Sequence, residues 1–233
     1  KFAVAIVAYG GLSLLGFPLT AGFLGQWDVL TAVGASSGMG WSLFLFLVGI
    51  TFKVTGKDIF DTLETAVIVC NHNSLIDIPV STPFLARANK TIAKKSFVYV
   101  PLFGWIYQFA SVIVDRKNNE SRRKSYEEMK RVLDNGLDML IYPEGTRNKT
   151  NNPLKSFYDG AFRLSVDTGK PIVPVVILNT KGILPAKPIL FLRPGKIVLN
   201  ILPAISPVGH TTESLKKLVF NIMAEHYEKN NKS

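Results

Sequence analysis

Short apolar runs alternate with amphipathic stretches from about residue 51 to the end of the chain. Four of these runs are short enough to be strands that are buried on both faces. They are Ala66–Cys70, Ser111–Val114, Asp138–Tyr142 and Ile172–Leu178. Strands separated by helical stretches are typical of a largely parallel sheet that is covered on both faces. The pattern therefore predicts an α/β fold with a mostly parallel central sheet flanked by helices.

Two of the helical stretches have the clearest periodicity. Ser121–Asp134 places Tyr126, Met129 and Leu133 on one face, and Gly136 follows as a stop signal. The other stretch runs from about residue 212 to residue 228. Its apolar residues recur at helical spacing, and they are Leu215, Leu218, Val219, Ile222 and Met223. Upstream of it, a turn at residues 193–196 between two apolar runs, 189–192 and 197–202, predicts a hairpin.

The first fifty residues contain only two charged side chains, Lys1 and Asp28. The two uncharged runs, Phe2–Trp27 and Val29–Phe52, are each long enough as helices to span roughly 30 Å of hydrocarbon. Glycines and a proline interrupt the runs, so two interpretations stay open: two spanning helices, or a helical hairpin within one leaflet. A cleaved signal peptide fits less well, because no small-residue cleavage site follows a compact apolar core.

Composition adds limits to this picture. The chain is 47% hydrophobic and 19% charged, which excludes a disordered protein. Its single cysteine, Cys70, excludes a disulfide framework, and three histidines make a Cys/His zinc cluster an unsuitable interpretation. The whole net charge of +10 lies outside the first fifty residues. We therefore predict a membrane-associated helical segment at residues 1–52 and a basic second domain at residues 53–233.

The stretch after the first predicted strand places His72 and Asp77 five positions apart. Within one helix these residues would lie about 140° apart. If the strand ends near Cys70 and a helix starts near Ser74, His72 lies in a loop and Asp77 can point back toward its ring. A carboxylate on one imidazole nitrogen frees the other as a general base, here for a substrate hydroxyl because no GxSxG nucleophile is present. Alternatively, Ser74 and Asp77 form only a capping box.

A second cluster follows the strand that ends near Tyr142. The residues Pro143-Glu144-Gly145-Thr146-Arg147 offer backbone donors, a hydroxyl and a bidentate cation, which suit a phosphate or an oxyanion. Two other basic groups, Lys94-Lys95 and Arg116, also follow short apolar runs. Several cations at the same sheet edge would suit an anionic substrate. The alternatives are a generic turn with an exposed arginine and ordinary solvated surface charge.

Four blocks of the sequence resemble the glycerolipid acyltransferases. NHNSLID at residues 71–77 fits their HxxxxD signature, and IYPEGTR at 141–147 resembles their second signature, usually written with Phe where Tyr142 stands. KKSFVYVPLFGW, ending in SVIVDR, resembles the block between them, and KPIVPVVI resembles their fourth. All four appear in order across residues 66–178, and the bacterial 1-acyl-sn-glycerol-3-phosphate acyltransferases are the best match.

The resemblance implies a reaction. A fatty acyl thioester on coenzyme A (acyl-CoA) or on acyl carrier protein (acyl-ACP) would acylate the sn-2 hydroxyl of lysophosphatidate, and the product would be phosphatidate. His72 would remove the hydroxyl proton and Asp77 would orient His72. The resemblance implies no cofactor and no metal. Residues 53–233 would form the catalytic domain, at the cytoplasmic face of the cell membrane, where membrane lipid and a soluble acyl donor meet.

The resemblance also implies roles at the substrate site. Arg147 matches the position that holds the acceptor phosphate, and Glu144, Gly145 and Thr146 would shape that site. Lys94 is the preferred basic residue of the middle block, with Lys95 as the close alternative. Arg116 would support the pocket.

Tyr158 departs from the family pattern, because it stands where many relatives have a lysine. Lys155 or Arg163 would be the substitute if that lysine binds phosphate. The departure keeps other acceptors open: glycerol 3-phosphate, another lysophospholipid or an acylated amino lipid. A non-enzymatic protein that binds anionic lipid is a further alternative, and it predicts that His72→Ala leaves function intact. Nucleic-acid binding has only the positive charge in its favour.

Overall fold

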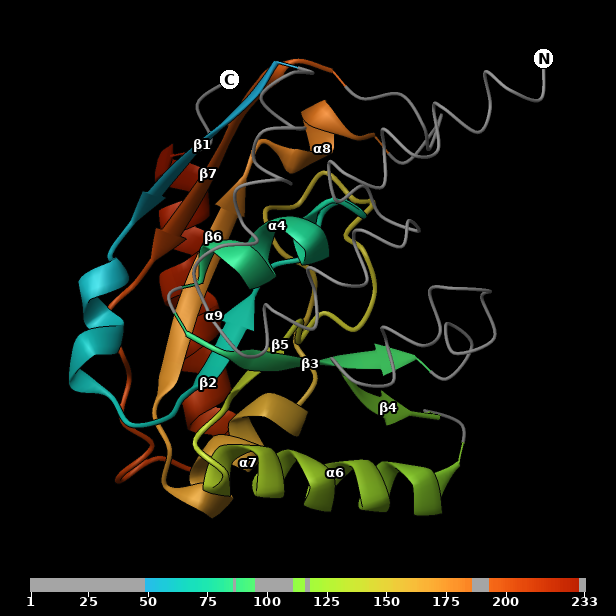
Figure 1. The fold of residues 1–233 in the computed structure, drawn as a ribbon, viewed down its shortest axis with the longest axis vertical. Coiled ribbons are helices and arrows are strands. Elements are labelled where there is room, and N and C mark those ends of the chain that lie inside the picture. Colours follow the sequence, from blue (N-terminus) through green and yellow to red (C-terminus); the bar gives the residue numbers. More distant parts are fainter. Residues whose placement is uncertain (1–48, 86, 95–110, 116–117, 186–192, 231–233) are drawn as a thin grey trace, which may run out of the picture.

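A computed structural model of the chain describes residues 49–85, 87–94, 111–115, 118–185 and 193–230. Within these residues, strands form a seven-stranded sheet in the order β1-β7-β6-β2-β5-β3-β4 (Figure 1). The strands are Ile50–Thr55 (β1), Val67–Cys70 (β2), Asn89–Lys94 (β3), Ser111–Val114 (β4), Asp138–Ile141 (β5), Ile172–Leu178 (β6) and Gly195–Ile201 (β7). Only β6 and β7 pair antiparallel; the other neighbours are parallel. The predicted α/β fold with a mostly parallel sheet is confirmed.

Helices cover both faces of this sheet. Their bounds are Lys57–Thr62 (the 3₁₀ helix η1), Asp77–Phe84 (α4), Asn119–Asp134 (α6), Gly160–Thr168 (α7), Thr180–Ile183 (α8) and Thr212–Asn230 (α9). Side chains of α6, α7 and α9 share one apolar cluster with the sheet, whereas η1, α4 and α8 share another. Figure 1 shows α4 in front of the sheet and α9 behind it.

The strand β2 illustrates why the central strands are uninterrupted apolar runs. Val67 and Val69 belong to the cluster with α6, α7 and α9, whereas Ile68 and Cys70 belong to the cluster on the opposite face. All four side chains are fully buried. Because successive side chains of a strand point to opposite faces, a sheet covered on both sides needs apolar residues at every position.

The predicted helix at residues 121–134 is α6, with two added residues at its start. The Asn118 side chain accepts a hydrogen bond from the Ser121 backbone N–H at 3.0 Å, which caps the helix. Gly136 follows with a φ of 78°, as expected of a stop signal. Met129 and Leu133 are buried as predicted.

The predicted last helix is α9, which continues to Asn230. Leu215, Val219 and Met223 are fully buried against the sheet, as their spacing predicts. Leu218 is 36% exposed, so it lies at the margin of the apolar face rather than in the core.

The boundary predicted at residue 52 needs a correction, because β1 begins at Ile50. The last three residues of the predicted helical segment pair with Gly195, Lys196 and Ile197 of β7 in parallel register, so they belong to the sheet. Gly56 ends β1 with a φ of 78°, where a Cβ would lie 2.3 Å from the Ile201 carbonyl oxygen. A residue with a side chain would therefore displace β1 from β7.

Two other sequence predictions fall wholly or partly on residues that the structure does not describe. The apolar segment at residues 1–48 lies outside the described ranges. Among the helices that are described, none is both long and apolar enough to cross a membrane. The hairpin arm at residues 197–202 corresponds to β7, which pairs with β1 and β6, whereas residues 189–192 lie outside the described ranges.

The parallel strands bring the predicted chemistry to one edge of the sheet. β2, β3, β4, β5 and β6 run in the same direction, so their carboxyl ends meet there. His72 follows β2, Tyr142 follows β5 and Lys94 ends β3. In open α/β sheets, this edge is where sites form.

Candidate active site

The imidazole of His72 is held by the carboxylate of Asp77. The Nδ1 atom of His72 lies 2.9 Å from Oδ2 of Asp77, which is fully buried, whereas the His72 side chain is 13% exposed. Asp77 is the first residue of α4, and its side chain points back to the loop after β2. This is the local geometry that the spacing of the two residues predicts. With Nδ1 donating to the carboxylate, Nε2 is the nitrogen that can accept a proton.

Asp77 also organises the start of α4. Its Oδ2 accepts the backbone N–H groups of Asn73 at 2.6 Å and Ser74 at 2.7 Å, in addition to the His72 ring. The capping interpretation and the His–Asp interpretation are therefore compatible, because one oxygen serves both. Ser74 donates its hydroxyl to the Leu184 carbonyl, which ties the loop to the end of α8.

The segment after β5 forms hydrogen bonds with both the N–H and the carbonyl of His72. Its N–H donates to Glu144 Oε1 at 2.8 Å, and its carbonyl accepts from the Asn148 N–H at 2.6 Å. The other oxygen of Glu144 accepts the Lys155 N–H at 3.0 Å. The two signature segments are thus joined through the backbone N–H and carbonyl of one residue, His72.

Glu144 is fully buried, and burial raises the pKa of its carboxyl group from 4.5 to about 7. The hydrogen bonds from the His72 and Lys155 backbones act in the opposite direction but are weaker than the desolvation. The sequence predicts that Glu144 helps to shape the substrate site. In the structure both of its oxygens accept backbone N–H groups, so it acts by holding the His72 loop and the Lys155 segment together.

The turn that follows presents Thr146 and Arg147. Gly145 donates its N–H to the Tyr142 carbonyl and has a φ of 70°, a conformation that favours glycine. Lys155 places its Nζ 3.0 Å from the Thr146 hydroxyl. Arg147 is half-buried and has no hydrogen-bond or ion-pair partner within the described part of the chain. A hydroxyl, an ammonium group and a guanidinium group therefore lie on one short segment, a combination that suits an anion.

The basic residues of the middle block are placed only in part. Lys94 ends β3, in register with Val114 at the end of β4, so its backbone lies at the edge that carries His72. Nothing is described of its side chain. Lys95 and Arg116 lie outside the described residues.

Asn71 and Asn73 flank His72 in the first signature segment, and each holds the His72 loop through a partner from a distant element. Asn71, fully buried, exchanges two hydrogen bonds with the Ile177 backbone, at 2.9 Å and 2.7 Å, and so fixes the end of β2 against β6. Asn73 donates to the Tyr227 hydroxyl at 3.2 Å, although Tyr227 lies 154 positions away on α9. Only the fold brings Tyr227 to this loop, so no local pattern predicts it.

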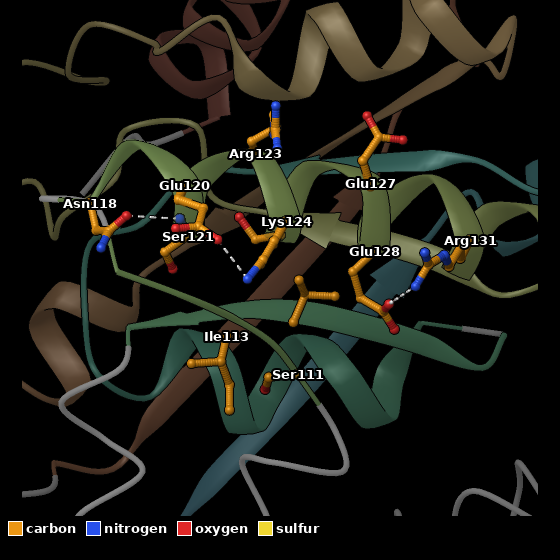
Figure 2. Close-up of a pocket in the computed structure, with 12 residues that line it drawn as sticks. Ser111, Ile113, Asn118, Glu120, Ser121, Arg123, Lys124, Glu127, Glu128 and Arg131 are labelled. Carbon is orange, nitrogen blue, oxygen red and sulfur yellow. Dashed lines mark hydrogen bonds and ion pairs between the residues drawn. The ribbon is translucent and has the colours of Figure 1, made fainter.

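A hollow of about 810 Å³ lies elsewhere, between β4 and α6 (Figure 2). Ion pairs join Glu120 to Lys124 and Glu128 to Arg131 along the part of α6 that lines it. None of the described lining residues is among the predicted site residues. The described residues also contain no group of three or more His, Cys, Asp or Glu side chains placed to hold a metal ion.

Comparison with known proteins agrees with this geometry. The family model described as Acyltransferase matches residues 51–178, which is more than half of the chain. The chain belongs to the acyltransferase family. The matched range begins in β1 and ends with β6, so it contains both segments that hold His72.

Relatives within the acyltransferase family include proteins named 1-acyl-sn-glycerol-3-phosphate acyltransferase. The chain is 34% identical over 140 residues to a 1-acyl-sn-glycerol-3-phosphate acyltransferase of Cocos nucifera, covering 59% of this chain and 44% of that protein. It is 26% identical over 158 residues to the Haemophilus influenzae enzyme of the same name, covering 67% of this chain and 64% of that one. The chain thus spans less than two thirds of either relative.

A solved acyltransferase structure has the same fold. The crystal structure of the 1-acyl-sn-glycerophosphate (LPA) acyltransferase PlsC from Thermotoga maritima matches with a TM-score of 0.72 and 25% sequence identity. The match covers 100% of this chain and 93% of that one.

The structure places Tyr158, where the chain departs from the family pattern, at the surface. Tyr158 is 67% exposed and donates its backbone N–H to the Pro143 carbonyl. Of the two possible substitutes for the absent lysine, Lys155 contacts Thr146 in the site. Arg163 instead pairs with Asp167 at 3.5 Å and lies over the Tyr126 ring. Of these two residues, Lys155 is therefore the one that contacts the turn preceding Arg147.

Proposed function

We propose that the protein transfers a fatty acyl group from acyl-CoA or acyl-ACP to the sn-2 hydroxyl of 1-acyl-glycerol-3-phosphate, giving phosphatidate. The observation that carries the proposal is the 2.9 Å hydrogen bond between His72 and the buried Asp77, clamped by the segment of Arg147. The names of the relatives support the acceptor. No cofactor or metal is part of the proposal.

The chemistry needs a base more than an acid. His72 Nε2 takes the proton of the acceptor hydroxyl as its oxygen attacks the thioester carbonyl. The carbon–oxygen bond forms and a tetrahedral oxyanion results, which collapses with cleavage of the carbon–sulfur bond. The imidazolium then gives this proton to the departing thiolate, so His72 returns to its neutral starting state. Asp77 keeps the imidazole in the productive tautomer and stabilises its charged form.

The acceptor phosphate binds at the turn after β5. Arg147 supplies the bidentate cation, with Thr146 and Lys155 beside it. Gly145 gives this turn its shape, and Glu144 holds the turn to the His72 loop. Lys94 or Lys95 provides positive charge near the phosphate or the oxyanion, and Arg116 supports the pocket.

The decisive test is a thioester-release assay on the purified full chain in detergent, with palmitoyl-CoA and lysophosphatidate. Free thiol and phosphatidate are both measured. We expect release that depends on the acceptor and falls about 10²–10⁴-fold in His72→Ala, because the general base is lost. The matched control is His210→Ala. His210 is a histidine outside the candidate site, where it hydrogen-bonds Ser214 near the start of α9.

Other outcomes would contradict the proposal in different ways. Thiol release without acceptor would indicate a thioesterase. An unchanged rate in His72→Ala would favour a lipid-binding protein without this chemistry. Silence with palmitoyl-CoA is followed by the same assay with acyl-ACP, and silence with both donors would overturn the acyl transfer.

A second acceptor remains a candidate because of Tyr158, which replaces a family lysine. Glycerol 3-phosphate, another lysophospholipid or an acylated amino lipid would use the same base. An acceptor panel at equal concentrations separates these cases. We expect lysophosphatidate to give the highest kcat/KM, and a higher value for another acceptor would replace it in the proposal.

We also propose that residues 1–49, which precede β1, attach the domain that follows them to the cytoplasmic face of the cell membrane. The two uncharged runs of the sequence support attachment, whether they span the bilayer or enter one leaflet. The net charge of +10 adds attraction to anionic lipid.

Vesicle sedimentation at low and high salt tests the attachment. Apolar insertion resists salt, whereas attraction by basic residues alone is screened. We expect salt-resistant binding of the full chain, which Leu45→Arg combined with Leu47→Arg weakens and the matched pair Leu45→Ile and Leu47→Ile preserves. Salt-sensitive binding of the unaltered chain would contradict insertion.

A further inference from the structure

The ring of Tyr142 packs against the ring of His72. Their centroids are 4.7 Å apart and their planes are inclined by 41°. Tyr142 is the first residue after β5, whereas His72 belongs to the loop after β2. The hydrogen bond to Asp77 constrains His72 at Nδ1, and the Tyr142 ring limits its tilt from the side. Two neighbours from different elements thus restrict one imidazole.

The hydroxyl of Tyr142 is itself tied to α4. It lies 2.7 Å from the hydroxyl of Ser81, which is fully buried. Ser81 comes four positions after Asp77, so the two residues lie on the same face of α4, one turn apart. Ser81 also donates to the Ile78 carbonyl at 3.3 Å, which leaves the Tyr142 hydroxyl to donate to Ser81.

We propose that Tyr142 is a positioning residue for the base of the acyl transfer, acting through its hydrogen bond to Ser81. The inference rests on the proposed function of His72. The helix that supplies Asp77 also anchors, through Ser81, the ring that packs on His72. Orientation of the imidazole against Asp77 and against Tyr142 therefore depends on one helix, α4.

The hydroxyl is the part of Tyr142 that carries this role. A phenylalanine, the residue usual at this position in the family signature that the segment resembles, would keep the ring but lose the bond to Ser81. Burial increases the value of the bond, because a hydroxyl without a partner is costly away from water. Small errors in the orientation of a catalytic group lower the rate at unchanged binding.

The test is a double-mutant cycle of Tyr142→Phe and Ser81→Ala, with kcat and KM measured for lysophosphatidate. We expect each single variant to lower kcat about fivefold at unchanged KM, as fits the loss of one hydrogen bond. The double variant should be no slower than the slower single variant, because both changes remove the same bond. Ser81→Thr keeps a hydroxyl, and we expect it to restore most of the rate.

Matched controls separate positioning from general destabilisation. Tyr126→Phe also removes a 2.7 Å hydrogen bond, to Asp167, and Ser165→Ala also removes the hydroxyl of a fully buried serine. Neither residue touches the His72 loop, so we expect unchanged kcat in both. Nuclear magnetic resonance of ¹⁵N-labelled imidazole adds a readout without turnover: His72 should show greater ring mobility in Tyr142→Phe than in Tyr126→Phe.

Each outcome decides one question. An inactive unaltered protein would overturn the proposed function, and the resonance of His72 would still test the positioning. An active protein with unchanged kcat in Tyr142→Phe, or with multiplicative losses in the double variant, would overturn the positioning role alone. A rise in KM at constant kcat would instead assign Tyr142 to substrate binding.

Discussion

A single residue, His72, connects the two signature segments of the site. Glu144 accepts its N–H, Asn148 donates to its carbonyl, and Asp77 fixes its ring. These partners come from two strand ends, and all three are fully buried or nearly so. The position of the proposed general base is therefore determined by several short, water-excluded hydrogen bonds.

At this scale we predict that Asp77→Asn lowers kcat about 10²–10⁴-fold, with KM little changed. The amide loses the negative charge that stabilises the imidazolium, and its neutral oxygen is a weaker acceptor for the three donors that now meet Oδ2. Steady-state kinetics with lysophosphatidate provides the measurement. Asp167→Asn is the matched control, because Asp167 bonds Tyr126 and pairs with Arg163 outside the site. Retained activity in Asp77→Asn would contradict the role of the pair.

The helix α6 shows how one element is fixed by local and tertiary terms together. Its polar face carries ion pairs such as Glu120 with Lys124, which contribute little because they are exposed. Its apolar face packs Met129, Val132 and Leu133 into the cluster shared with α7 and α9. The start of the helix depends on the Asn118 side chain.

We predict that Asn118→Ala lowers the free energy of unfolding by about 1 kcal/mol, because the Ser121 N–H loses its acceptor. Asn118→Ser should retain most of the stability. Urea unfolding followed by circular dichroism measures both. Asn119→Ala serves as the control, since the hydrogen bond that its side chain accepts from Arg122 is exposed and long, at 3.5 Å. Equal stability of Asn118→Ala and the unaltered protein would show that the cap is dispensable.

For the whole molecule, pH links stability to buried ionisable groups. Burial raises the pKa of Glu144 from 4.5 to about 7 and also raises the pKa of Asp138. A carboxyl group with a raised pKa in the folded state stabilises the protein fully below its ordinary pKa, and this contribution is lost as pH rises through the folded pKa. His226 acts with the opposite sign, because burial lowers its pKa.

We predict that the unaltered protein loses stability between pH 5 and pH 8 relative to Glu144→Gln, by at most about 3 kcal/mol. The glutamine does not titrate, so the part of the slope that belongs to Glu144 disappears. Urea unfolding midpoints at pH 5, 6, 7 and 8 give the comparison. Glutamine donates where glutamate accepts, so the variant should be less stable overall at low pH. Parallel pH curves for the two proteins would contradict the raised pKa.

The sequence by itself determined the elements whose signal is local. Alternation and length identified β2, β4, β5 and β6, and helical periodicity identified α6 and α9. Spacing also placed Asp77 where its carboxylate meets His72, because only a loop and one helical turn separate them. The predicted helical segment extended three residues too far, because an apolar run at the start of β1 does not reveal that its partner is β7.

Only the tertiary structure decided the contacts that join distant parts of the chain. Glu144 meets the His72 peptide across 72 positions, Tyr227 meets Asn73 across 154, and Tyr142 meets Ser81 across 61. Lys155 rather than Arg163 lies beside Thr146 for the same reason. Periodicity predicts which face of an element is buried, but it does not predict which residues of other elements that face will contact. That pairing follows from the order of strands in the sheet, which brings their carboxyl ends together.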